Sequence, residues 1–303
     1  MAILQHSVVK DTLTRAGHYL ANAIEQAEQP VYTPYEFFYL ILKMYREPKD
    51  EKLYLRAKTP TAEDYVRHRT NLKNAGVIGA DRDYGSKIIR ALAVPDRPAD
   101  EIVCLADRLC YISHISAMQR WGITNRRPDA LFLTRPDRNI ARQKLQEIMA
   151  ADASKGVVNP YPLKNILHPK RVRRRPLHVL ETKTLGKNIR ARGSAARLAT
   201  IGQTFLDTIQ NPVLCGGMSH VLDVWEEHAK YYLDEIIESV DHIESSIVKS
   251  RAGYILEERL LIKADRRIDA WKAFVQRGGS RKLDPTKDFA PTYSEKWMIS
   301  LNA

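Results

Sequence analysis

Residues 61–76 read TAEDYVRHRTNLKNAG and predict a short helix. Thr61 suits the N-cap, and Asp64 places a carboxylate where a helix N-terminus favours negative charge. Gly76 is the expected left-handed stop. The apolar positions that helical spacing turns inward are Ala62, Tyr65, Val66, Leu72 and Ala75. The opposite face is expected to carry Arg67, His68, Asn71 and Asn74, with Arg69 and Lys73 near its edges.

Residues 77–94 continue as VIGADRDYGSKIIRALAV and predict a hairpin. The strands are expected at 77–78 and 87–92, joined by a turn rich in aspartate and glycine. A polar helix followed by a charged hairpin is typical of a winged helix, whose helix lies in the DNA major groove and whose hairpin tip lies beside the backbone. The side chains predicted to contact DNA are Thr61, Arg67, His68, Thr70, Asn71, Lys73, Asn74, Lys87 and Arg90.

These contacts divide into two kinds. Arg67, Asn71 and Asn74 suit base edges, since arginine pairs with guanine and asparagine with adenine. Lys87 and Arg90 flank the hairpin and are expected to hold phosphates, which position a protein without specifying sequence. The alternative for the helix face is simple solvation.

The stretch before residue 61 predicts two more helices. One spans residues 7–28, and the second opens at Thr33-Pro34, where proline at the first helical position costs least. A short strand is possible at residues 53–55. Three helices and a hairpin suit one winged-helix domain over residues 1–97, closed by Pro95 and Pro98.

Composition favours a folded chain with a polyanionic partner. The 303 residues carry a net charge of +12, with 44% hydrophobic and 28% charged residues. Nucleic acid is the first expected partner and an acidic protein the second. The three cysteines predict neither a disulfide framework nor a paired zinc motif. With no signal peptide and no apolar run of membrane-spanning length, a cytoplasmic location is expected.

A second domain is predicted over residues 98–303. Its first part, 98–198, is expected to be mixed α/β, with a strand and a helix within 101–123, a strand at 131–134, a helix at 139–153 and a strand at 177–180. This part holds a tract with few acids, a candidate surface for nucleic acid or an acidic partner. The basic side chains assigned to that surface are Arg171, Arg173, Arg174, Arg175, Lys183, Lys187, Arg190 and Arg192.

Residues 199–303 are expected to be mainly helical. The apolar periodicity predicts helices at 198–209, 221–245, 246–263 and 268–277, and a strand at 296–301. The fold class predicted for the whole chain is therefore α+β: a winged helix-turn-helix domain, then a mixed α/β domain ending in a helical bundle.

Most catalytic motifs are absent, so neither enzymatic activity nor a cofactor or metal site is expected. One alternative stays open. Pro128-Asp129 precedes a predicted strand, and Glu181-x-Lys183 ends another, in the order of a Mg²⁺-dependent nuclease site. There two carboxylates would hold the metal that activates water. The motif is short and degenerate.

Two stretches of the second domain resemble the AbiEi family of antitoxin transcriptional regulators. HISAMQRWGITNRRPDALFLT (114–134) is similar to the family's Ser-Ala segment, and IGQTFLDTIQNPVLCGGMSHVLDVW (201–225) to its Thr-Leu-x-Asp…Gly-Gly segment. Residues 283–285 and 294–302 resemble its C-terminus. The residues that match the motifs are expected to be structural: Ser116, Ala117, Gly122, Asp207, Gly216 and Gly217. Asp207 is expected to pair with a neighbouring arginine.

The resemblance implies a function in two halves. The N-terminal domain would bind inverted repeats in double-stranded DNA at its own promoter, with an oligomer on DNA possible. The C-terminal domain would counter a nucleotidyltransferase-type toxin from an adjacent gene, as in type IV systems of phage defence. A winged-helix transcription factor with no toxin partner is the alternative of another class.

Overall fold

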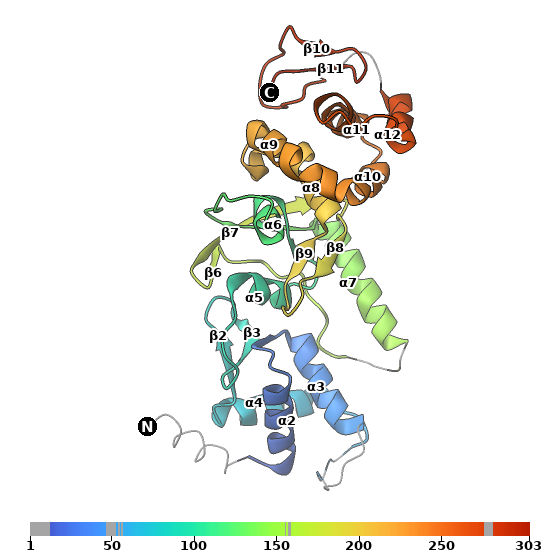
Figure 1. Cartoon of the computed structure of the whole chain (residues 1–303). Coiled ribbons are helices and arrows are strands. Elements are labelled where there is room, and N and C mark those ends of the chain that lie inside the picture. The colour runs from blue at the N-terminus through green and yellow to red at the C-terminus, as the bar shows by residue number, and fades with distance from the viewer. Residues whose placement is uncertain are drawn as a thin grey trace.

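The computed structural model describes residues 13–46, 53, 55, 57–154, 156, 159–275 and 281–303. Its elements stack in three tiers, with small N-terminal helices and a sheet at one end, a second sheet in the middle and helices at the other end (Figure 1). Helices and several sheets mix along the chain, so the α+β class is confirmed. No helix in the described ranges combines the length and apolar content needed to cross a bilayer.

The N-terminal tier places three helices on a three-stranded antiparallel sheet of order β1-β3-β2. Its elements are α2 (Arg15–Gln26), β1 (Val31–Tyr32), α3 (Pro34–Arg46), α4 (Ala62–Asn74), β2 (Ile78–Asp81) and β3 (Gly85–Ala91). Phe37, Phe38 and Ile41 of α3 are fully buried, because this helix is apolar on most sides. Residues 7–12 of the first expected helix and Tyr54 of the possible strand lie outside the described residues.

The middle tier is a six-stranded mixed sheet of order β6-β7-β5-β4-β9-β8. The pairs β5–β7 and β4–β9 are parallel, and the other neighbours are antiparallel. The elements are α5 (Ala99–Ala106), β4 (Tyr111–Ile112), α6 (His114–Trp121), β5 (Leu131–Pro136), α7 (Arg138–Ala153), β6 (Arg171–Val172), β7 (Arg175–Thr182), β8 (Asn188–Arg190) and β9 (Arg197–Ala199). The sequence interpretation missed α5, which buries Ile102, Val103 and Ala106 at helical spacing.

The third tier packs helices around Trp225, Trp271 and Trp297. Its elements are α8 (Ile201–Gln210), a 3₁₀ turn (Pro212–Cys215), α9 (Met218–His228), a 3₁₀ turn (Ala229–Tyr232), α10 (Leu233–Asp241), α11 (Ser246–Gly253), a π-helical turn (Tyr254–Arg259), α12 (Arg266–Ala270), a 3₁₀ turn (Trp271–Phe274), β10 (Tyr293–Ser294) and β11 (Ile299–Ser300).

The prediction of one helix over residues 221–245 was wrong. A straight helix of that length would span roughly 38 Å, more than twice the roughly 15 Å of α8, against which it packs. The break at Ala229–Tyr232 lets both α9 and α10 pack against α8. Similarly, the helix expected at 246–263 changes to π-helical pitch after Gly253.

The first two tiers share a core. Val31, Tyr84 and Ile88 of the N-terminal sheet are buried in the same cluster as Ile102, Tyr111 and Leu133 of the middle tier. Ile89, next to Ile88 on β3, faces the N-terminal helices instead. Side chains of a strand alternate between its faces, so the small sheet serves both cores.

Candidate nucleic-acid interface

Helix α4 begins as the sequence predicts. The Thr61 hydroxyl accepts from the Asp64 amide at 3.2 Å, and the Asp64 carboxylate accepts from the Thr61 amide at 3.0 Å. This reciprocal capping box satisfies two donors of the first turn. Although burial opposes the shift, the hydrogen bonds from Thr61 and the charge of Arg67 lower the pKa of Asp64. Gly76, at φ 64°, follows the helix in the left-handed region.

We expect Thr61→Ala to lower the free energy of unfolding by about 1 kcal/mol, because the Asp64 amide loses the Thr61 hydroxyl that accepts its hydrogen bond. Urea unfolding followed by tryptophan fluorescence measures the change. Thr70→Ala, on the exposed side of the same helix, is the control and should change stability by less than about 0.5 kcal/mol. Equal effects of the two substitutions would contradict the capping role.

The exposed face of α4 is rotated from the predicted one. Val66, expected inside, is 56% exposed, and Ala62 is exposed as well. His68, expected to contact DNA, is buried at 4% exposure, and burial lowers its pKa. The error arose because the polar residues were assumed to share one face, whereas Tyr65, His68 and Leu72 form the buried side. The exposed face consists of Ala62, Glu63, Val66, Thr70, Asn71, Lys73 and Asn74.

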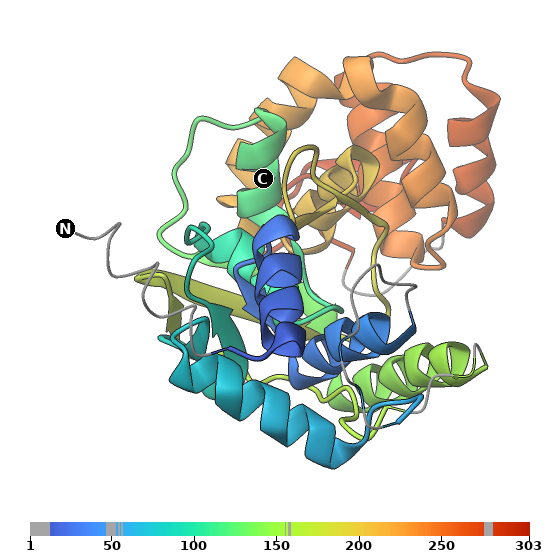
Figure 2. The ribbon, with the colours of Figure 1, turned by 90° about the horizontal axis from the view of Figure 1, so that it is seen from below.

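Arg67 and Asn71 lie at one edge of this face, beside α2. Arg67 pairs with Asp64 one turn earlier, and its side chain is 40% exposed. Both residues border a cleft of about 400 Å³ that Leu53 and Leu55 also line. In contrast, Thr70, Lys73 and Asn74 make no side-chain hydrogen bond or ion pair with other described residues. Figure 2 shows α4 among the elements nearest a viewer at this end of the molecule.

The hairpin tip, which was expected to lie beside the DNA backbone, is bound to another part of the protein. Arg173, in the turn after β6, ion-pairs with Asp81 at 2.7 Å, with Asp96 at 3.0 Å and with Asp83. Its side chain is only 6% exposed, so the prediction that it lies on a basic surface was wrong. Although burial opposes the shift, hydrogen bonds from Arg173 and the backbone lower the pKa of Asp81. The tip, which also carries the exposed Arg82, is therefore attached to the middle tier.

Of the two phosphate ligands predicted on the hairpin, Arg90 is already bound to backbone oxygens and Lys87 is exposed. The guanidinium of Arg90 donates to the carbonyls of Pro30 at 2.8 Å and Val94 at 2.6 Å, which makes it a structural cross-link. Lys87 is exposed, but it lines a pocket between the first two tiers together with Pro34 and Arg108. The expected phosphate role fails for Arg90, because its donors are already occupied by backbone oxygens.

A buried polar chain reinforces the contact between the tiers. The Tyr84 hydroxyl lies 2.8 Å from Nδ1 of His168, and Nε2 of His168 lies 3.2 Å from Asp107. Arg135 lies 3.3 Å from the same carboxylate. Burial opposes the shift, yet His168 and Arg135 lower the pKa of Asp107. Sequence reasoning missed these residues, because they are far apart along the chain and belong to no local motif.

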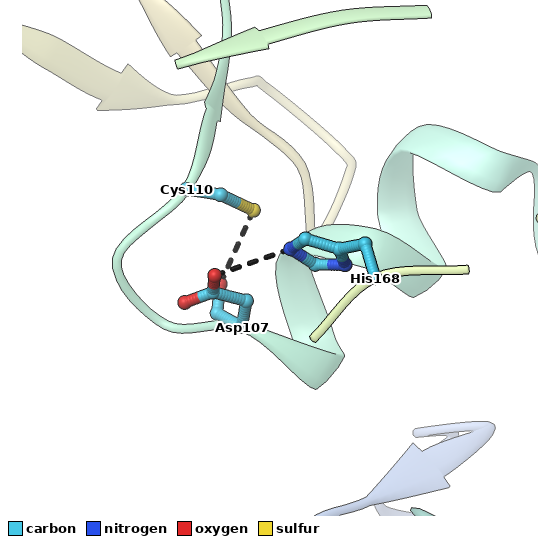
Figure 3. A group of neighbouring side chains, drawn as sticks. All are labelled: Asp107, Cys110 and His168. Atoms are coloured by element: carbon cyan, nitrogen blue, oxygen red, sulfur yellow. Dashed lines mark hydrogen bonds and ion pairs between the residues drawn. The ribbon is translucent and has the colours of Figure 1, made fainter. Parts of the chain in front are cut away.

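Asp107, Cys110 and His168 form the group in the described residues that could hold a metal ion (Figure 3). Their ligand atoms lie within 4.8 Å of one another. The neighbouring Arg135 guanidinium already supplies a positive charge to the Asp107 carboxylate, and the Cys110 thiol donates to the Asp107 carbonyl at 3.3 Å. Each group has a protein partner, so the cluster fits a structural role better than a metal centre.

The sheet divides the basic tract. Arg171 and Arg174 lie at the β6 edge, whereas Lys187, Arg190 and Arg192 lie at or beside β8, the opposite edge. Five strand spacings separate these edges, roughly 24 Å. The prediction that these basic side chains form a single surface was therefore wrong. Arg175 is half-buried, Lys183 is exposed after β7, and Lys187 pairs with Glu238 at 2.7 Å.

Strand register contradicts the nuclease alternative. β5 and β7 are parallel, with Arg135 opposite Glu181. Asp129 lies six residues before Arg135, at the other end of the pair. At about 3.3 Å per residue, the start of β5 at Leu131, which Asp129 precedes, is roughly 13 Å from Arg135, so Asp129 and Glu181 lie at opposite ends of the strand pair.

The motif-matching residues occupy structural positions. Ser116 accepts from the Phe132 amide at 3.0 Å, Ala117 is buried, and Gly122 caps α6 at φ 72°. Gly216 and Gly217 form a left-handed turn at φ 91° and 88°.

Asp207 lacks the arginine partner expected for it. Its partner is Gln203, which donates at 2.7 Å, and burial raises the pKa of Asp207 to about 7. The sequence could not show this, because the nearest basic side chains on neighbouring elements bond elsewhere; Arg251, for example, donates to the Ile209 carbonyl at 2.8 Å.

No family model and no curated protein matches the chain. Among solved structures, the chain is similar to the crystal structure of the RV2827C protein from Mycobacterium tuberculosis. The two are 9% identical, with a TM-score of 0.49, and the alignment covers 94% of this chain and 90% of that one.

Proposed function

We propose that the chain is a DNA-binding autorepressor that contacts duplex DNA through α4. The N-terminal order of helix, strand, helix, helix, strand and strand supports a winged-helix domain. The observation that carries the proposal is the exposed side of α4, where Thr70, Lys73 and Asn74 have polar groups uncommitted to other described residues. A helix can enter the major groove only if such a face is free.

The proposed binding mode departs from the usual winged helix at the hairpin. Because Arg173 holds the Asp81 and Asp83 carboxylates and the exposed Arg82 pairs with Asp96 at 3.0 Å, the charged groups of the tip already have partners within the protein. Recognition would then depend on α4 alone, with Val66 able to contact a thymine methyl and Asn74 an adenine edge.

The second half of the proposal is neutralisation of a toxin. It rests on the resemblance of residues 114–134 and 201–225 to the AbiEi antitoxins, whose partner is a nucleotidyltransferase encoded beside them. The motif residues stabilise the middle and third tiers, so these tiers are the proposed antitoxin part. The protein would have no catalytic activity of its own.

We expect purified protein to bind the duplex upstream of its gene, measured by fluorescence anisotropy. Asn74→Ala should cost about 1–3 kcal/mol of binding free energy and relax specificity at one base position. Lys73→Ala should weaken all duplexes alike and reduce the salt slope by about 1. The control is Lys230→Ala, an exposed lysine of the third tier. Unchanged binding by both α4 variants would refute the interface.

Co-expression with the neighbouring open reading frame tests the antitoxin half separately. Growth should be rescued by the wild type and by the Lys73→Ala/Asn74→Ala variant, since neutralisation is assigned to the other tiers. DNA binding without rescue would leave a plain transcription factor.

A further inference from the structure

A pocket of about 500 Å³ lies where the first two tiers meet. Its walls come from the start of α3, Lys87 of β3, the chain after α5, Leu145 of α7 and the irregular segment 160–167. The volume is within the range of sites for small molecules, which commonly lie between domains.

The lining is apolar with a cationic rim. Pro34, Leu145 and Leu163 supply apolar surface, and Leu167 is 80% exposed beside it. Lys87 and Lys164 are exposed and make no hydrogen bond or ion pair with any other residue that the structure describes. Such a lining matches a small molecule with an apolar body and one negative charge.

The acids near the pocket are already neutralised. Asp107 is paired with Arg135 and His168, as described above, and Glu36 accepts from Arg108 at 3.0 Å. An anionic ligand would therefore meet two uncommitted ammonium groups and no uncommitted carboxylate among the lining residues.

One wall of the pocket touches the proposed recognition helix. The ring of Tyr161 packs on Tyr65 of α4, with centroids 3.8 Å apart. Its hydroxyl donates to the Ala62 carbonyl, in the first turn of α4, at 3.3 Å. A ligand that displaces or fixes Tyr161 would change the position or mobility of α4.

We infer that this pocket is an effector site for a small amphipathic carboxylate, with Lys87 and Lys164 binding the carboxylate and Tyr161 coupling occupancy to α4. The effect on DNA affinity rests on the proposed function, whereas the binding site does not. Two states of α4 with different ligand affinity are what such coupling requires.

Calorimetric titration of the full chain with octanoate and with 3-phenylpropionate tests the site and separates acyl from aromatic ligands. We expect saturable binding of at least one acid with a Kd below about 1 mM. Lys87→Gln/Lys164→Gln should weaken it about tenfold or more, the scale of lost charge-assisted hydrogen bonds. Lys230→Gln, the control, should bind as the wild type does.

Three results would overturn the site: no saturable binding of either acid, equal binding by the double variant, or equal binding of the neutral alcohols 1-octanol and 3-phenylpropanol. Hydrogen exchange of residues 61–66 tests the coupling without DNA. The bound acid should change their exchange rates at least threefold, and unchanged rates would overturn the effector role. If exchange responds but no duplex binds, the proposed function fails and the effector site stands.

Discussion

Arg173→Ala should lower the free energy of unfolding by about 3–5 kcal/mol, the usual cost of removing one member of a buried ion network. The Asp81 side chain is fully buried, so water cannot replace the guanidinium that this carboxylate loses, whereas Asp83 is 17% exposed. The Arg173 amide also donates to Asp83 at 2.9 Å, a bond that the substitution retains. The loss of stability therefore measures the contribution of the Arg173 side chain alone.

Two variants sharpen this test. Arg174→Ala removes the next, exposed arginine and should change stability by less than about 0.5 kcal/mol. Arg173→Lys keeps the charge, but the compact ammonium lacks the three spread nitrogens with which the guanidinium reaches Asp81, Asp83 and Asp96, so the loss of stability should be intermediate. Urea unfolding provides the free energies.

The pH dependence has a defined sign. The pKa of Asp81 is lower in the folded protein than in the unfolded chain. The contribution of Asp81 to the free energy of unfolding is therefore present above the unfolded pKa and is lost as the pH falls through the folded pKa. The difference in the free energy of unfolding between wild type and Arg173→Ala should therefore become smaller as the pH falls. A constant difference from pH 7 down to pH 3 would show that the ion network is not its origin.

Local signals predicted much of the fold. The Thr61 cap, the Gly76 stop and the strands around residues 131 and 177 were all placed within a few residues, because capping and apolar runs act over short distances. The helix α5 was missed, since its charged start, Asp100 and Glu101, concealed the apolar positions that follow.

The candidate nucleic-acid interface depends on contacts between residues far apart along the chain, and local sequence patterns cannot show such contacts. The hairpin was predicted, but its attachment to the middle tier joins Asp81 to Arg173, about ninety residues away. The basic tract is continuous in sequence, yet strand order puts its ends at opposite sheet edges. Likewise, the spacing of Asp129 and Glu181 suggested a metal site until the parallel register separated them.

The second large effect concerns Asp207, in the core of the third tier. Asp207 is 6% exposed, and the Oδ2 atom of its carboxyl has no hydrogen-bond partner among the described residues. Burial raises the pKa from 3.8 to about 7. Folding therefore takes up a proton at this carboxyl between pH 4 and pH 7.

Stability should fall over that interval. The pKa of Asp207 is higher in the folded protein than in the unfolded chain. The protonated carboxyl therefore adds to the free energy of unfolding below pH 4, and this contribution is lost as the pH rises to 7. At 1.36 kcal/mol per unit, the loss at pH 8 is about 4 kcal/mol. Asp207→Asn carries no charge at any pH and should be more stable than wild type at pH 8 by up to that amount.

The comparison requires unfolding curves of both proteins from pH 4 to pH 8. The difference in the free energy of unfolding between Asp207→Asn and wild type should increase steadily with pH, because only the wild type must bury a carboxylate near pH 8. Asp223→Asn, an exposed aspartate of α9, is the control and should follow the wild type throughout. If Asp207→Asn is instead less stable at pH 8, then the Asp207 carboxylate is stabilised by a cationic partner or water, and the side chain serves the fold in its charged form.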